Sequence, residues 1–153
     1  MKPTHMLLAG VLVGAMSVSA AATAQAGPSA RASRVAKVQL RHTGKGTILV
    51  TSSGFTLYEF TRDHGSNSCV RISGCAGLWP AYETTGQPIA GSGVRASSLS
   101  MTTLPDHAKQ VTFDGHPLYT YSGDSGPGET SYVGEREFGG DWDALTASGH
   151  AVG

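Results

Sequence analysis

The pattern Tyr-x-aromatic-x-x-Asp occurs twice in this chain, and a tryptophan follows each copy. The residues are Tyr58, Phe60, Asp63 and Trp79 in the first copy, and Tyr119, Tyr121, Asp124 and Trp142 in the second. Aromatic rings beside a carboxylate suit a sugar, a cationic ligand or a flat cofactor. The same rings would equally form a packed core stripe, because aromatic pairs on strands mostly pack on one another. Packing is the favoured interpretation, and ligand binding by two clusters lining one groove is the alternative.

The aspartates follow directly after predicted strands. Side chains alternate between the faces of a strand, so Tyr58 and Phe60 share one face, and Leu57 and Glu59 share the other. An aspartate at a strand end accepts hydrogen bonds from loop amides, or from a tyrosine hydroxyl that would otherwise be buried unpaired.

Three histidines are weak candidates for a metal site. His64 adjoins the first motif aspartate, and His116 would lie across a predicted meander from His107. No H-x-x-x-H or H-x-H spacing supports them. No cofactor is predicted.

Catalytic patterns are poorer still. The sequence has no G-x-S-x-G elbow, and the Gly123-Asp124-Ser125-Gly126 stretch is explained by its place in the repeat as a turn. Carboxylate pairs for glycoside hydrolysis cannot be identified from spacing along the chain. The protein is therefore not predicted to be an enzyme.

The elements that must position these residues are short strands. Residues 46–51 and 55–60 flank the turn residues 52–54 and predict a hairpin. Residues 99–121 predict a three-stranded meander, with Asp114-Gly115 as a strong hairpin turn. The expected fold class is mainly β, a single domain of antiparallel hairpins.

The two halves of the chain align as an internal repeat. Residues 54–63 align without a gap on residues 115–124, and 75–82 align on 138–145, with two extra residues in the second loop. The copies span about 46–84 and about 99–149, and together they form a predicted domain at 46–149. Two copies are too few for a solenoid, so we expect them to pack on each other.

This doubled pattern resembles the bacterial family of secreted repeats of unknown function, also described as predicted lipoproteins with a Tyr-x-aromatic-x-x-Asp motif. The supporting stretches are Trp79-Pro80, residues 115–119, and Phe138-Gly139-Gly140-x-Trp142. The resemblance covers about residues 46–149 and implies a location in the cell envelope, with no established activity. Many relatives are lipid-anchored, but this chain lacks a cysteine near its predicted cleavage point, so anchoring is not carried over.

Cys69 and Cys75 are the only cysteines. An even count in an exported protein predicts a structural disulfide, worth about 2 kcal/mol for so short a loop. A soft-metal site of two reduced thiols is the alternative.

Residues 1–26 have the basic start, apolar stretch and Ala24-Gln25-Ala26 cleavage site of a signal peptide. Residues 27–45 are expected to be a flexible basic leader. The protein is predicted to be exported to the periplasm or beyond, without an N-terminal lipid anchor, and no transmembrane segment is expected in the mature chain.

Charge offers no support for nucleic acid as a partner. Eleven basic residues balance eleven acidic ones, whereas nucleic-acid binding needs a basic excess. The leading hypothesis is a monomeric, non-enzymatic binding or structural module whose partner is an envelope component or a small ligand. The alternatives are an envelope accessory protein that handles redox equivalents, metal or haem, and a small extracytoplasmic hydrolase.

Overall fold

Short strands dominate the computed structural model, which describes residues 34–153. The strands are β1 (Lys37–Thr43), β2 (Gly46–Thr51), β3 (Tyr58–Phe60), β4 (Glu83–Thr84), β5 (Ile89–Ala90), β6 (Leu99–Thr103), β7 (Lys109–Phe113), β8 (His116–Pro117), β9 (Glu135–Glu137), β10 (Gly140–Leu145) and β11 (Ala151–Val152). Helix α1 is a single turn at Cys75–Leu78, and 3₁₀ turns lie at Cys69–Arg71 and Ala96–Ser98. The predicted signal peptide and residues 27–33 lie outside the described part.

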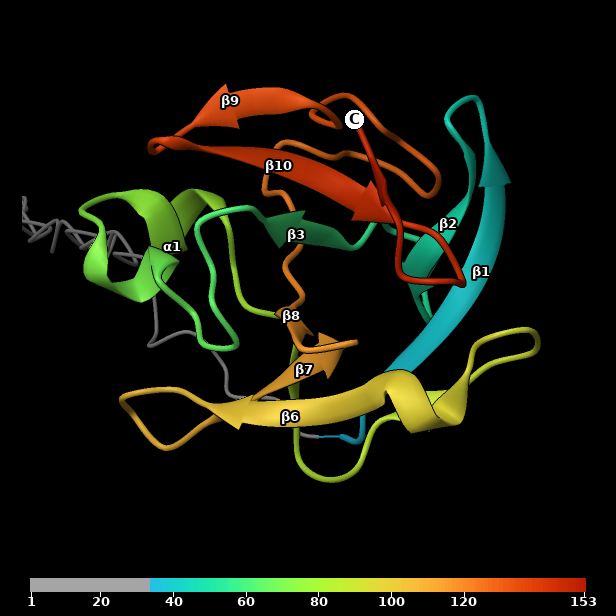
Figure 1. Cartoon of the computed structure of the whole chain (residues 1–153), viewed down its shortest axis with the longest axis horizontal. Coiled ribbons are helices and arrows are strands. Elements are labelled where there is room, and N and C mark those ends of the chain that lie inside the picture. Colours follow the sequence, from blue (N-terminus) through green and yellow to red (C-terminus); the bar gives the residue numbers. More distant parts are fainter. Residues whose placement is uncertain (1–33) are drawn as a thin grey trace, which may run out of the picture.

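The strands form three small sheets. Their orders are β2-β1-β5, then β11-β10-β3 with β9 on β10, and β4-β7-β6 with β8 on β7. Every named strand pair is antiparallel except β1 with β5. Figure 1 shows β9 and β10 on one side of the molecule, β6 and β7 on the other, and β3 and β8 between them. The prediction of a mainly antiparallel β fold is confirmed.

The predicted meander is present as β6, β7 and β8, but the return strand β8 ends at Pro117 rather than at residue 121, and Tyr119 pairs with Tyr58 and Ala81 of the first copy. Its second turn places Asp114 at φ 49° and Gly115 at φ 86°. Both positive values belong to the type I′ turn, whose twist matches that of the flanking strands. The Asp114-Gly115 pair therefore forms the hairpin turn that the sequence predicts.

The first predicted hairpin is present only in part. The Thr51 amide donates to the Phe55 carbonyl at 2.8 Å, and the Leu57 amide donates to the Leu49 carbonyl at 3.1 Å. Beyond Leu57 the chain leaves β2, and Tyr58–Phe60 pairs with β10 instead. The return strand is therefore split between two sheets.

The expected flexible leader ends earlier than residue 45. Residues 37–43 form β1, in which residues 38–43 pair with β2 and Lys37 pairs with Ile89 of β5. Val38 is fully buried and Leu40 packs against the core, while Lys37 and Arg41 point outward. The prediction of a flexible leader was wrong for these residues because it relied on their basic charge. A strand can have charged side chains on its solvent face and apolar side chains on the opposite face.

The two copies are related by an approximate two-fold arrangement. Tyr58 and Tyr119 occupy equivalent places and pair with each other, each amide donating to the other's carbonyl at 2.9 Å. Ala144 pairs with Tyr58, and its counterpart Ala81 pairs with Tyr119. Each tyrosine strand therefore pairs with both strands of the opposite copy, so the copies interleave.

Buried side chains form two clusters on opposite faces of these strands. An aromatic core contains Tyr58, Phe60, Trp79, Tyr119 and Trp142 together with the disulfide. An aliphatic core contains mainly leucine and valine, including Leu57 and Leu118. Neighbouring residues thus enter different cores, as strand alternation predicts.

The disulfide between Cys69 and Cys75 is present and joins the 3₁₀ turn to α1. Across residues 34–153, no helix has the length and apolar character needed to cross a membrane.

Candidate functional site

The motif tyrosines and aspartates bond across the two copies. The Tyr58 hydroxyl donates to Asp124 Oδ2 at 3.0 Å, and the Tyr119 hydroxyl donates to Asp63 Oδ2 at 2.6 Å. Both tyrosines are fully buried. Burial, followed by the charge of the partner carboxylate, raises the pKa of each phenol far above its usual range. Each hydroxyl is therefore held protonated as a donor, and the two bonds clamp the copies together.

Each aspartate also closes the loop that follows it. Asp63 Oδ1 accepts from the Ser68 amide at 2.8 Å and from the Ser68 hydroxyl at 2.6 Å. Asp124 Oδ1 accepts from the Ser131 hydroxyl at 3.0 Å. Burial raises the pKa of Asp124, while its hydrogen bonds to Ser131 and Tyr58 oppose that rise. One carboxylate thus fixes its own loop and the opposite strand.

The motif tryptophans stack on each other at the centre. The rings of Trp79 and Trp142 are 3.7 Å apart and nearly parallel, at 3°. Phe60 stacks on Trp142 at 4.1 Å, and its counterpart Tyr121 lies 4.7 Å from Trp79. Offset and stacked aromatic pairs add about 0.5–1.5 kcal/mol each beyond the area they bury. The rings therefore join the copies as the tyrosine–aspartate bonds do.

The indole N–H groups of the two tryptophans differ in their hydrogen bonding. Trp79 Nε1 donates to Glu137 Oε2 at 3.3 Å. Trp142 Nε1 is buried without a hydrogen-bond partner among the described residues. Extending the repeat alignment by one residue places Gly74 opposite Glu137, so the first copy has no carboxylate at the matching position.

The eight predicted motif residues thus come together, but mostly inside the protein. Five of them, all aromatic, are no more than 1% exposed. Tyr121 and Asp124 also line a surface cavity, described below. The structure brings both aromatic clusters into one shared core.

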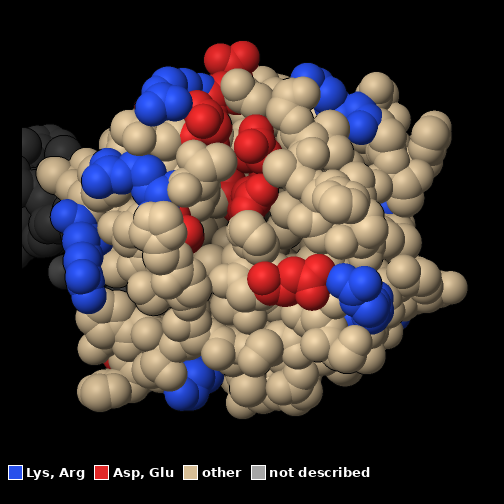
Figure 2. Space-filling model, in the orientation of Figure 1, with Lys and Arg blue, Asp and Glu red and all other residues tan. Residues whose placement is uncertain are grey.

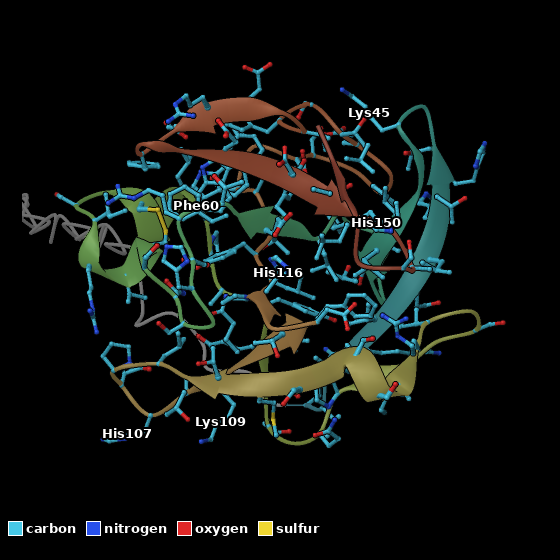
Figure 3. The ribbon with its side chains drawn as sticks, viewed as in Figure 1. Lys45, Phe60, His107, Lys109, His116 and His150 are labelled. Atoms are coloured by element: carbon cyan, nitrogen blue, oxygen red, sulfur yellow. A yellow bond between two sulfur atoms is a disulfide. The ribbon has the colours of Figure 1, made fainter. Side chains whose placement is uncertain are left out.

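The candidate histidines do not gather. Figure 3 places His116 near the middle of the molecule and His107 at the tip of the β6–β7 hairpin. Within residues 34–153, no group of three or more His, Cys, Asp or Glu side chains is arranged to hold a metal ion. His64 is exposed beside the motif aspartate.

His116 instead forms an ion pair with the buried carboxylate of Glu59. Burial raises the pKa of Glu59, the histidine opposes that rise, and the nearby charge of Asp143 adds to it. Asp143 lies directly opposite Glu59 on β10. Figure 2 shows the acidic side chains gathered over β9 and β10, where Glu135 and Asp141 also lie. The junction is the place where the Tyr58 and Tyr119 segments of the two copies pair with each other. The contact between Glu59 and His116 closes this side of the junction.

The equivalent side of the junction is open. The repeat alignment places Phe55 where the second copy has His116, and Thr120 where the first copy has Glu59. Phe55 and Thr120 line a cavity of about 480 Å³. No ion pair can form between a phenyl ring and a hydroxyl, so the sequence difference accounts for the missing closure.

The cavity wall is mixed in chemistry and comes from both copies. Aromatic rings, hydroxyls and charges contribute, namely Phe55, Tyr82 and Tyr121; Thr51, Ser52, Ser53, Thr120 and Ser122; and Arg34, Lys37, Glu83 and Asp124. The Tyr82 hydroxyl donates to the Lys37 carbonyl at 2.8 Å, which ties β1 to the wall. Sequence reasoning missed Phe55 and Tyr82, although the mismatch of Phe55 with His116 was a usable signal.

A second groove of about 550 Å³ lies between the disulfide loop and the β6–β7 turn. Val70, Ala76 and Pro80 form one wall, and Leu104 and Pro105 form the other. It is more apolar than the junction cavity and contains one motif residue, Trp79.

Comparison with known proteins gives a match for the second copy. Residues 101–146 match the model of a family described as a secreted repeat of unknown function. The match falls within the predicted second repeat and confirms the resemblance there. Neither the curated proteins nor the solved structures gave a match.

Proposed function

Because its second copy matches a family of secreted repeats, we propose that this protein is exported and acts as a non-enzymatic binding module. Its ligand site is the junction cavity between the two copies. Its motif residues act as the frame that holds the cavity wall.

One observation carries this proposal: the copies match in their frame but differ at the cavity. Glu59 and His116 close one side of the junction, and their counterparts Thr120 and Phe55 leave the other side open. A pair of copies that needed only stability would gain from closing both sides, because a filled space provides more packing contacts than a void. The open side therefore points to a use for the space.

The size and lining of the cavity support a small ligand. Ligand sites typically enclose roughly 300–1,000 Å³ and combine apolar walls with a few fixed polar groups. Phe55 and Tyr121 provide ring faces, and Thr120 and Ser122 provide hydroxyls. Two basic and two acidic side chains balance in the wall, which favours a ligand without a large net charge.

Asp124 is the motif carboxylate in this wall, and its bonds support a framing role. Each of its oxygens already accepts a hydroxyl, from Tyr58 and from Ser131. Proton transfer to Asp124 would weaken the hydrogen bonds by which it joins the copies and holds its loop. A binding role is therefore favoured over hydrolysis at this carboxylate.

The test is a thermal-shift screen of the purified chain with neutral sugars, amino acids, polyamines, haem and divalent cations. A ligand that binds only the folded state stabilises it by RT ln(1 + L/Kd), where L is the free ligand concentration, so the melting temperature rises with ligand concentration. The decisive variant carries Phe55→His with Thr120→Glu, which transplants the closed pair into the open side. We expect this variant to fold and to lose the ligand-induced rise.

The matched control is Arg95→Ala, which removes an exposed ion pair with Asp114 away from the cavity. It should keep the full ligand response. If the closed variant responds as the wild type does, the ligand binds elsewhere. If no compound in the screen shifts either protein, the binding role itself is contradicted.

A further inference from the structure

A column of touching aromatic rings runs from the centre of the protein to its surface. Trp79 stacks on Trp142 at 3.7 Å, and Tyr132 lies 5.1 Å from Trp79 and 4.6 Å from Tyr121. Both tryptophans are fully buried, whereas the two tyrosines are partly exposed. Electron exchange depends on orbital overlap, which falls steeply with distance, so rings in contact exchange electrons fast. Trp and Tyr are also the aromatic side chains that give up one electron most readily.

The surface end of the column has a proton acceptor. Glu137 accepts the Trp79 Nε1–H at 3.3 Å. Burial, followed by the hydrogen bond to Glu137 and its charge, raises the pKa of Tyr132 to about 12. A phenol that loses an electron must also lose its proton, and here a carboxylate is ready to take it. Glu137 is therefore the hydrogen-bond acceptor of both Trp79 and Tyr132.

The other end has no such outlet. Trp142 Nε1–H has no acceptor within the described part of the chain, so an oxidised Trp142 keeps its proton and remains a strong oxidant. It can relax by taking an electron from Trp79, whose ring lies parallel and in contact. The oxidising equivalent therefore moves toward Trp79 and Glu137.

Two buried tyrosines could also give an electron to the oxidised tryptophans. Tyr58 and Tyr119 each lie 5.2 Å from a stacked tryptophan and donate to Asp124 and Asp63. A proton passed to either aspartate would weaken the bonds that it accepts from its own loop. Both phenols are fully buried, so a radical there cannot take a hydrogen atom from a molecule in solution, because that transfer needs direct contact, whereas an electron can cross the short distance to a buried ring. Tyr132 is the outlet because its ring and the carboxylate of its hydrogen-bond partner Glu137 are both partly exposed.

We propose that the aromatic core is a one-electron relay that carries an oxidising equivalent from the stacked tryptophans to Tyr132 at the surface. An external one-electron oxidant of the peroxide-activated haem class removes one electron from the Trp79–Trp142 pair. Tyr132 returns one electron to the pair, and its hydroxyl proton passes to the Glu137 carboxylate. The neutral Tyr132 radical then takes one hydrogen atom from an external thiol or phenol, and Glu137 releases its proton to water.

The test starts the relay at the tryptophans. Short ultraviolet pulses at the red edge of tryptophan absorption, where tyrosine does not absorb, photo-ionise the pair in the intact chain. Transient absorption follows the tryptophan radical, and a soluble spin trap followed by peptide mass spectrometry locates the surface radical. In the wild type we expect tryptophan-radical decay into a tyrosine radical, with the adduct on Tyr132.

Glu137→Gln keeps an oxygen acceptor for Trp79 but removes the proton acceptor, so the Tyr132 adduct should fall severalfold. Tyr132→Phe should abolish the adduct, and Glu135→Gln, which alters an exposed carboxylate of the same strand that accepts no bond from Trp79, should leave it unchanged. An equal Tyr132 adduct in Glu137→Gln and wild type would overturn the proposal. So would a wild-type tryptophan radical that decays without forming any tyrosine radical.

Discussion

Replacing Asp63 by alanine tests how the two copies are joined. The Asp63 carboxylate accepts three hydrogen bonds, one from the Tyr119 hydroxyl at 2.6 Å and two from Ser68 at 2.6 and 2.8 Å. Leaving the buried Tyr119 hydroxyl without its acceptor costs about 1–3 kcal/mol. Losing the bonds that fix the disulfide loop adds about 1 kcal/mol, as for a lost cap. We therefore expect Asp63→Ala to lower the free energy of unfolding by about 2–4 kcal/mol.

Asp124→Ala is the matched comparison in the second copy. Asp124 accepts two hydrogen bonds rather than three, and both are 3.0 Å long. The expected loss is smaller, about 1–3 kcal/mol. Urea unfolding followed by circular dichroism measures both variants, and an unchanged m-value shows that the folded state is intact.

A double-mutant cycle then identifies the bonded pair. Asp63→Asn with Tyr119→Phe should show a coupling energy of at least about 1 kcal/mol, because the two groups share one bond. Asp63→Asn with Tyr58→Phe should be additive within roughly 0.5 kcal/mol. The reverse result, coupling within one copy and additivity between copies, would refute the interleaved arrangement.

Four further outcomes follow. The two buried motif phenols have a raised folded-state pKa, so above about pH 10 the unfolded state loses protons that the folded state keeps. Stability should therefore fall with rising pH, and Tyr119→Phe should reduce that slope by about 1.4 kcal/mol per pH unit in unfolding titrations. Replacing both Cys69 and Cys75 by serine should lower stability by about 2 kcal/mol, measured against the wild type in urea. His116→Phe should cost about 1–3 kcal/mol by leaving the Glu59 carboxylate buried without its partner, whereas adding Glu59→Thr should recover most of the loss. Residues 99–149 expressed alone should not fold as a monomer, and sedimentation with circular dichroism would show either an unfolded chain or a dimer.

Local features of the fold could be predicted from the sequence because they depend on near neighbours. The Asp114-Gly115 turn follows from the backbone preferences of two residues, and the Cys69–Cys75 disulfide from a count of two cysteines. The division of Tyr58 and Leu57 between two cores follows from strand alternation alone. None of these needs knowledge of the opposite copy.

The partner of each motif residue could not be predicted. The two copies carry the same tyrosine and aspartate, so a bond within one copy and a bond between copies satisfy the same sequence pattern. The choice depends on where β3 pairs, and β3 joins β10 from the far end of the chain. Strand β1 escaped prediction for a related reason, since Val38 is buried only once β2 lies beside it.

The candidate sites follow from the same interleaving. Because Tyr58 bonds Asp124 and Tyr119 bonds Asp63, the most alike residues of the two copies are fixed by each other and are not free to diverge separately. Positions beside the frame carry no such constraint, and there Phe55 faces a cavity while His116 closes on Glu59. The same holds for Glu137, which gives one tryptophan an acceptor that the other lacks. A duplicated core that must stay symmetric thus leaves function to its asymmetric edges, and the proposed cavity and the surface end of the proposed relay are located there.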